Sequence, residues 1–387
     1  MSARRIYYID WLRVLAVLLL FPFHTMRVYN HEIFYVKGSD LSYVFDYVIG
    51  FIDLWHMPLL FLLAGMSTYL ALGKRTTGQY AYERVKRLLV PFVFGFFVLI
   101  PPQTWYGAQY WQDRSWDGQA FDIVTASSFW EYITRGRMFV INVQEGGDYF
   151  GGFGIGQLWF IFYLFVISML LLPVIAFTRT ERGRAFARRL ASGLAKPVWW
   201  LLPAVLLWFT EGLPDPVDKS FFMYLTLFLL GFIAISNEAF AESTERNRWW
   251  TLVAGVLICV VYSATWRWRD SLPDPSWALA GANVAGQLGV WFVLMGALGM
   301  GRKYLDRTSS FLAYQAEASY PVYLLHQTVI VVIAFYLVQV QMPLYLQWLL
   351  LLIAAVAVTF AVYEGVRRVG WLRFCFGMRP KRPPTAA

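Results

Sequence analysis

The stretch Ile9-Asp-Trp-Leu-Arg-Val-Leu-Ala-Val-Leu-Leu-Leu-Phe-Pro-Phe-His-Thr25 is an apolar run that contains a cation, Arg13, and an imidazole, His24. In a helix these two positions are related by about 1100° of rotation and a rise of about 16 Å, so their side chains share one face. An arginine near the centre of a membrane helix is unfavourable by about 2.5–3.5 kcal/mol. We therefore expect this face to line a site where a cytoplasmic anionic donor meets a substrate from the other side of the membrane.

The composition indicates a multi-span membrane protein whose surroundings are the lipid bilayer. Of the 387 residues, 58% are hydrophobic and only 15% are charged, whereas a soluble domain has about 25% charged residues. The aromatic share of 19%, with 18 Trp, suits a protein with two membrane–water interfaces. The net charge of +9 comes from basic residues between apolar segments, so we expect no nucleic-acid partner. The sequence leaves the oligomeric state open.

A membrane-spanning helix needs about 20 mostly apolar residues. On this criterion we predict an all-α fold with about ten transmembrane helices. The fifth candidate is the weakest, because it is short and contains Pro203. The ten segments are 9–28, 45–72, 86–104, 154–177, 197–210, 220–240, 249–266, 278–300, 312–338 and 343–365.

The distribution of basic residues predicts that both termini are cytoplasmic. With ten spans, 24 of the 33 Lys and Arg residues lie on the cytoplasmic side and 8 on the outer side, as the positive-inside rule requires. Omitting the fifth span would invert everything after it. We predict a single transmembrane domain over 1–378 with a short basic tail at 379–387. The longest connection, 105–153, is then an outer loop, and loops of this length are usually functional or disordered.

A pair of arginines opens the third predicted span. Arg84 and Arg87 are spaced i, i+3 and so share a helix face. Together with Arg13 at the same membrane level they would form an anion site, because the guanidinium fork binds phosphate bidentately. The alternative is that they extend to lipid headgroups, as basic residues at a cytoplasmic helix start usually do.

Histidines within spans are the other candidates for chemistry. His326 lies about as deep in the ninth span as His24 lies in the first, so the two imidazoles are expected to share one cavity. Ionisable groups inside the membrane are functional candidates by default. The alternative for each is a hydrogen bond that links two helices, and this alternative is strongest for His56.

Two acidic residues complete the candidates for substrate binding, with His56. Asp10 lies three residues before Arg13 and would orient or neutralise it, although an acid in a first helical turn has an ordinary dipole explanation. Glu317 lies early in the ninth span, but its nine-residue separation from His326 puts the two on opposite faces of a straight helix. Cys259 and Cys375 lack metal-ligand spacing, so we expect no metal.

Taken together, these motifs resemble the integral-membrane acyltransferase family 3. That family is marked by an arginine and a histidine ten residues apart in the first span and by an Arg-x-x-Arg pair at the third. Further matches are Met57-Pro-Leu-Leu-Phe-Leu-Leu-Ala-Gly65, Gln157-Leu-Trp-Phe160 and Tyr320-Pro-Val-Tyr-Leu-Leu-His326. Within the family the chain looks most like the branch that transfers succinyl groups to osmoregulated periplasmic glucans.

The resemblance implies a multi-pass protein of the cell inner membrane. It would transfer an acyl group, acetyl or succinyl, from cytoplasmic acyl-CoA as co-substrate to a hydroxyl of an extracytoplasmic carbohydrate. Arg13, Arg84 and Arg87 would then bind the donor phosphates. His24 would act as the base, since histidine titrates near neutral pH, and His326 would position the acceptor or the thioester carbonyl.

A non-enzymatic transporter or exporter of an anionic solute or glycan is the alternative, with the same arginines binding substrate in transit. Transporters often show repeats with broken helices in matching positions. We find no convincing repeat of this kind in the sequence, so the acyltransferase interpretation is favoured.

Overall fold

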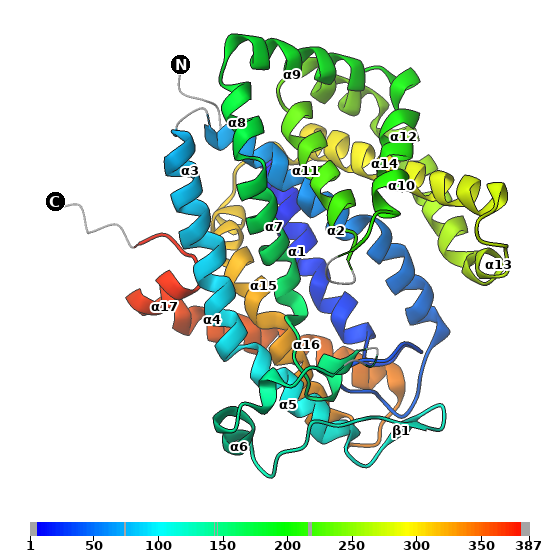
Figure 1. Cartoon of the computed structure of the whole chain (residues 1–387), viewed down its shortest axis with the longest axis vertical. Helices are drawn as coiled ribbons and strands as arrows, with labels where there is room; N and C mark the ends of the chain where they lie inside the picture. The colour runs from blue at the N-terminus through cyan, green and yellow to red at the C-terminus, as the bar shows by residue number, and fades with distance from the viewer. Residues whose placement is uncertain (1–5, 73–74, 143, 145, 216–218, 381–387) are drawn as a thin grey trace. The chain divides into compact units, whose positions relative to one another are not determined.

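The computed structural model describes residues 6–72, 75–142, 144, 146–215 and 219–380, and within them it is almost entirely helical (Figure 1). The helices are α1 Tyr7–Met26, α2 Tyr43–Leu72, α3 Thr77–Arg84, α4 Val90–Val98, α5 Ile100–Trp111, α6 Phe129–Thr134, α7 Trp159–Leu170, α8 Leu172–Thr178, α9 Glu181–Leu194, α10 Leu201–Glu211, α11 Phe221–Ala234, α12 Glu238–Ala264, α13 Trp266–Asp270, α14 Trp277–Leu305, α15 Ser310–Leu337, α16 Leu344–Val366 and α17 Gly370–Cys375. A π-helix, η1 Val85–Leu89, lies between α3 and α4. Two short strands, β1 Ser115–Trp116 and β2 Gln119–Ala120, pair antiparallel.

Seven helical segments of the described chain are long and apolar enough to cross a membrane, and the number rises to nine if each of two bent helix pairs counts as one span. The protein is therefore a multi-pass membrane protein, as predicted. The predicted span 197–210 falls in the second arm of a pair, 181–194 and 197–211, whose arms meet at 93°. The predicted span 220–240 contains α11, which has only 14 residues. The count of ten spans and the cytoplasmic termini remain predictions.

The chain divides into two compact units, each built from segments far apart in the sequence. Unit 1 consists of Met1–Ala16, Gly50–Glu83 and Val166–Ala316, and unit 2 of Val17–Ile49, Arg84–Phe165 and Glu317–Ala387. The single domain over 1–378 remains a prediction. Of the predicted basic tail, 381–387 lies outside the described residues.

In unit 1, glycines let helices approach until their backbones touch. A Cβ atom at Gly65 of α2 would lie 2.0 Å from the main-chain oxygen of Phe228, and one at Gly231 of α11 would lie 2.0 Å from that of Leu62. Helices in lipid gain little from the hydrophobic effect, so they associate through close van der Waals packing at small residues. Neither glycine therefore has room for a side chain.

The same device joins α12 and α14, which lie side by side (Figure 1). A Cβ atom at Gly255 would lie 2.5 Å from the nitrogen of Val293, and one at Gly299 would lie 2.1 Å from the oxygen of Thr244. Side-chain caps fix where these helices begin, because the side chains of Asn237 and of the Ser276 N-cap accept hydrogen bonds from main-chain N–H groups.

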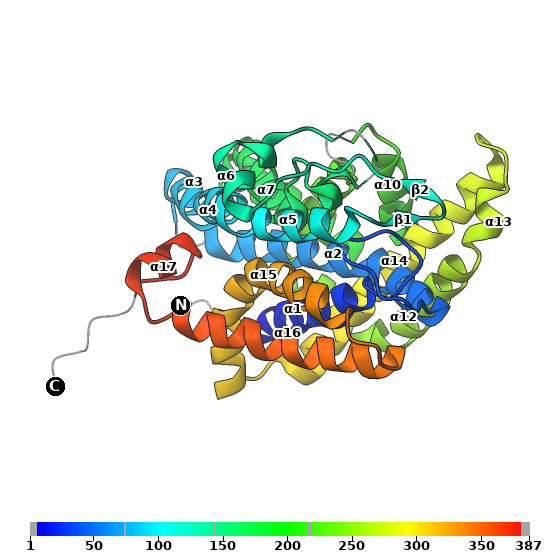
Figure 2. The same cartoon turned by 90° about the horizontal axis from the view of Figure 1, so that it is seen from below.

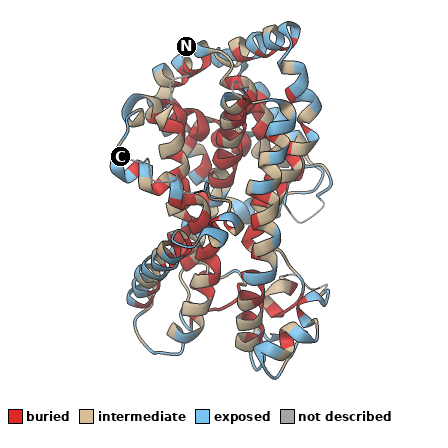
Figure 3. Cartoon of the chain, turned by 90° about the vertical axis from the view of Figure 1, so that its left-hand side faces the viewer, coloured by how far each residue is buried: buried red, intermediate tan, exposed pale blue. Residues whose placement is uncertain are grey.

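Apolar side chains remain exposed on the outer sides of many helices. Leu257 of α12 and Ile353 of α16 are 60% and 57% exposed, and buried and exposed residues alternate around individual helices (Figure 3). In water such surfaces are rare, whereas in a bilayer they face lipid chains at no cost. This agrees with the spans assigned from length and composition.

In unit 2, the described residues of the long connection 105–153 pack around an aromatic core. The rings of Phe121 and Phe150 stack with centroids 4.0 Å apart, and the buried Trp111 contacts both edge-on. The hydroxyl of Tyr132 donates to the oxygen of Gly151 at 2.7 Å. Figure 2 shows this connection and its β1–β2 hairpin from below. The described part of this loop is therefore folded.

Candidate active site

Unit 2 brings together the two histidines with predicted catalytic roles. The rings of His24 on α1 and His326 on α15 have centroids 5.0 Å apart with planes tilted by 50°. Phe21 lies edge-on to His326 at 6.0 Å, and Phe34 lies edge-on to His24 at 6.5 Å. His326 is only 1% exposed. Two imidazoles therefore lie side by side among aromatic rings, close enough to act on one substrate group.

The hydrogen bond of His326 fixes which ring nitrogen carries the proton. Its Nδ1 lies 2.5 Å from the main-chain oxygen of Tyr323. A carbonyl oxygen only accepts, so Nδ1 is the donor and in the neutral ring Nε2 has the basic lone pair. Helix α15 thus holds His326 in a single tautomer through its own preceding turn.

Buried polar side chains surround this histidine pair. The amide nitrogen of Gln157 donates to the oxygen of Leu324 at 3.0 Å and to the hydroxyl of Thr328 at 3.4 Å. The hydroxyl of Tyr323 donates to the main-chain oxygen of Gln157. These contacts fix the start of α7 to the part of α15 that carries His326. The sequence singled out Gln157 through its motif, whereas Thr328 gave no signal.

The network continues from Thr328 towards the long loop. The hydroxyl of Thr328 lies 3.4 Å from Oε1 of Gln103, and Nε2 of Gln103 donates to the hydroxyl of Tyr35 at 3.3 Å. Tyr35 in turn donates to the carboxylate of Asp148. Burial raises the pKa of Asp148 above its usual value, although the bond from Tyr35 opposes this shift. Sequence reasoning missed these residues because single Gln, Tyr and Asp residues carry no motif.

The arginine pair lies at the start of the third span, where the helix changes its geometry. Arg84 ends α3, and Arg87 lies in η1, in which the N–H of Val90 bonds five residues back to Val85. Turns of this kind occur frequently at functional sites. The ring of Tyr320 on α15 and the main-chain oxygen of Arg87 lie 2.8 Å and 3.0 Å from the position that a Cβ atom would take at Gly377. Arg84, Arg87 and Tyr320 all belong to unit 2 and are called here the arginine site, and anion binding by them remains a prediction.

Arg13 is held within unit 1. Its guanidinium donates to Asp10 at 3.2 Å and to the hydroxyl of Ser67 on α2 at 2.6 Å. The pairing of Asp10 with Arg13 is therefore present, as expected from their spacing. Because the structure describes Arg13 in one unit and His24 in the other, their common site remains a prediction, as does a cluster of Arg13 with the arginine site.

The structure gives His56 and Glu317 protein partners. The ring of His56 is 2% exposed, and its Nε2 donates to the oxygen of Ala16 at 2.7 Å, which links α2 to α1 within unit 1. Glu317 accepts a hydrogen bond from Arg373 at 2.9 Å. Both contacts are structural in kind, and a role in substrate binding remains a prediction for both residues. Among the described residues, no group of three or more His, Cys, Asp or Glu residues could hold a metal ion.

A family model described as an acyltransferase domain matches residues 6–364. This chain belongs to the acyltransferase family 3. Relatives with the name glucans biosynthesis protein C come from Escherichia coli strain SMS-3-5, 24% identical, Escherichia coli strain K12, 23% identical, and Salmonella heidelberg strain SL476, 22% identical. Each match covers 98% of this chain and 96% of the relative. No solved structure matches the chain. The protein is thus a membrane-embedded acyltransferase.

Proposed function

We propose that this protein is an O-acyltransferase of the cell inner membrane that moves an acetyl or succinyl group from cytoplasmic acyl-CoA to a hydroxyl of an extracytoplasmic glucan. The observation that supports this proposal is the pair of imidazoles, His24 and His326, whose ring centroids are 5.0 Å apart. The acceptor class follows the name of the relatives, which are glucans biosynthesis proteins.

The arginine site suits the donor. Coenzyme A is rich in phosphate, and guanidinium groups bind phosphate through paired hydrogen bonds. Arg84 and Arg87 would bind these phosphates at the end of the span predicted to be cytoplasmic. Arg13, held by Asp10 and Ser67, is proposed as a third donor-binding cation, with its guanidinium already oriented.

The histidine pair suits the transfer. A sugar hydroxyl attacks a thioester slowly until a base takes its proton. We assign this step to His24, and His326 positions the acceptor or the thioester carbonyl. The hydroxyl oxygen forms the new ester bond to the acyl carbon as the bond from that carbon to sulfur breaks. The imidazolium then returns its proton to the departing thiolate, so coenzyme A leaves as the thiol and the base is regenerated.

The test compares cell-surface glucans from cells with the wild-type protein, with His24→Ala and without the protein, by mass spectrometry. We expect an acyl adduct only with the wild-type protein, and the added mass identifies the acyl group. A matched control is His31→Ala, because His31 pairs with Asp46 outside the histidine pair. Wild-type acylation in His24→Ala would reject the assignment. Glucan transport into proteoliposomes that contain no acyl donor would instead support a transporter.

A further inference from the structure

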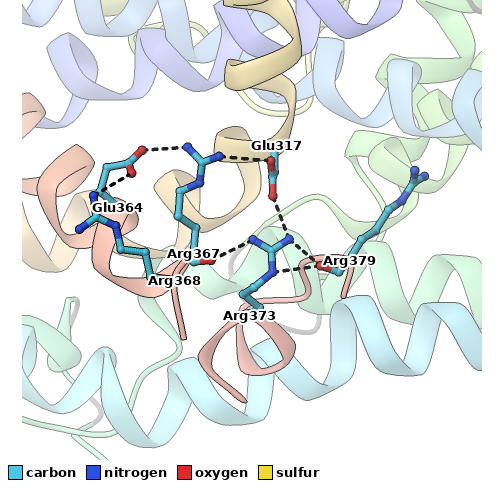
Figure 4. A network of polar contacts seen from close by, with 6 residues as sticks. All are labelled: Glu317, Glu364, Arg367, Arg368, Arg373 and Arg379. Carbon is cyan, nitrogen blue, oxygen red and sulfur yellow. Dashed lines mark hydrogen bonds and ion pairs between the residues drawn. The ribbon is translucent and has the colours of Figure 1, made fainter. Parts of the chain in front are cut away.

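The segment that follows α16 folds back on unit 2 around a buried arginine. This segment, residues 370–379, comprises α17 and the four residues after it, and Arg373 in it is 7% exposed. Nη2 of Arg373 donates to Oε1 of Glu317 at 2.9 Å, and Nη1 donates to the oxygen of Arg367 at 3.1 Å. Nε donates to the oxygen of Arg379 at 3.1 Å. Figure 4 shows that one guanidinium thus ties together α15, the end of α16 and the end of the segment.

Such an arrangement calls for a functional explanation. Burying a guanidinium costs several kcal/mol in desolvation unless its hydrogen bonds are satisfied, and a buried ion pair is often no more stable than an apolar substitute. Here all three guanidinium nitrogens donate to main-chain oxygens, and Nη2 donates to Glu317 as well. Arg373 and Glu317 therefore fix the path of the backbone of residues 370–379.

The segment ends against the arginine site. A Cβ atom at Gly377 would lie 2.8 Å from the ring of Tyr320, 3.0 Å from the main-chain oxygen of Arg87 and 3.0 Å from the ring of Pro91. Gly377 has a φ of +64°, a left-handed backbone conformation that residues with a side chain rarely adopt. Phe376 packs edge-on against Phe94 of α4 at 5.3 Å. The segment therefore supports both the backbone of Arg87 and the ring of Tyr320.

We propose that Glu317 and Arg373 are positioning residues for the acyl donor, because they hold residues 370–379 as one wall of the arginine site. This inference rests on the proposed function, since the site would bind the phosphates of acyl-CoA. Neither residue touches the donor. Each acts through the segment, which keeps the π-helical turn of Arg87 in place and closes the site beside Tyr320.

The test measures binding of desulfo-coenzyme A to the purified full-length protein in detergent, together with initial transfer rates. We expect Arg373→Ala to raise the Kd for this probe and the KM for the donor about tenfold or more, with the kcat and the acceptor KM nearly unchanged. Glu317→Gln keeps an accepting oxygen and should have a smaller effect of the same kind. The matched control is Arg368→Ala, which removes the same charge from an exposed pair with Glu364.

A second readout reports on the segment itself. Cys375 in α17 is partly exposed, whereas the other cysteine of the chain, Cys259, is fully buried, so a maleimide reports on Cys375. Arg373→Ala should speed this labelling, and Arg373→Lys, with its single point charge, should fall between Arg373→Ala and the wild type. Gly377→Ala is an independent variant that displaces the segment while Arg373 remains.

The outcomes separate this inference from the proposed function. A wild-type protein that neither binds the probe nor transfers an acyl group would reject the proposed function. A wild-type protein that binds the probe would leave the proposed function in place, and the inference would then be overturned by either of two results. One is faster labelling in Arg373→Ala and Gly377→Ala with unchanged probe affinity. The other is unchanged labelling and unchanged affinity in both variants.

Discussion

Removing the two histidines singly and together tests whether they act as one catalytic unit. A positioned general base contributes about 10²–10⁴ in rate, or about 2.7–5.5 kcal/mol of barrier. The ring centroids of His24 and His326 are 5.0 Å apart, well inside the separation of roughly 7–10 Å beyond which mutations act independently. We expect His24→Ala to lower kcat by about 10²–10⁴ and the double variant to be little worse.

The assay is transfer of a radiolabelled acyl group from acyl-CoA to glucan in proteoliposomes. The rate constants of the wild type, the two single variants and the double variant are measured at saturating donor. His31→Ala is the matched control, because its ring stacks on Tyr43 and pairs with Asp46 away from the site. Independent histidines would give additive costs, which is a loss of about 10⁴–10⁸ in the double variant. Additivity, or a full rate in either single variant, would refute a shared function.

Three further predictions concern the donor, the helix packing and pH. Arg84→Ala and Arg87→Ala should each weaken binding of desulfo-coenzyme A by roughly 10- to 150-fold in a calorimetric titration, since a hydrogen bond to a charged group contributes about 1.5–3 kcal/mol; an unchanged affinity in both would remove the phosphate role. Gly65→Ala should lower the thermal unfolding midpoint by inserting a Cβ atom 2.0 Å from a main-chain oxygen of α11, whereas Gly78→Ala, with nothing within 4 Å, should not; equal midpoints would contradict the packing. Because the pKa of Asp148 is raised by burial in the folded protein, the folded state binds its proton more tightly than the unfolded state, so the contribution of Asp148 to the wild-type midpoint should fall as the pH rises above the usual carboxyl value of 3.8. Asp148→Asn should lack this fall, and the same pH dependence in both proteins would contradict it.

The spans could be predicted where apolar length alone decides them. The segments around α1, α2, α14, α15 and α16 were all identified this way, because a bilayer demands about 20 apolar residues whatever they pack against. The spans in the region 181–234 could not be predicted from apolar length alone. There the structure has a basic helix, a bend of 93° and a 14-residue helix, and bends depend on packing that hydropathy does not contain.

The sequence could predict that the rings of His24 and His326 lie close together, but it could not predict which residues contact them. The matching depths of His24 and His326 followed from counting residues along two spans. Which residues hold them did not, since Tyr323 bonds His326 through its main chain. The contacts of Glu317 could not be predicted either. Its position opposite His326 followed from helix geometry, whereas its bond to Arg373 joins positions 56 apart in the chain.

The π-helical turn at Val85–Leu89 has a consequence for how this chain tolerates length changes. A turn that closes over five residues instead of four contains, in effect, one inserted residue. Deleting that residue would restore ordinary pitch and turn everything on its N-terminal side by about 100° relative to the rest. Arg84 would then turn relative to Tyr320 while Arg87 kept its place. The relative orientation of the two arginines thus depends on the π-helical turn. Deleting a single residue here should therefore disturb the arginine site far more than deleting one in a loop.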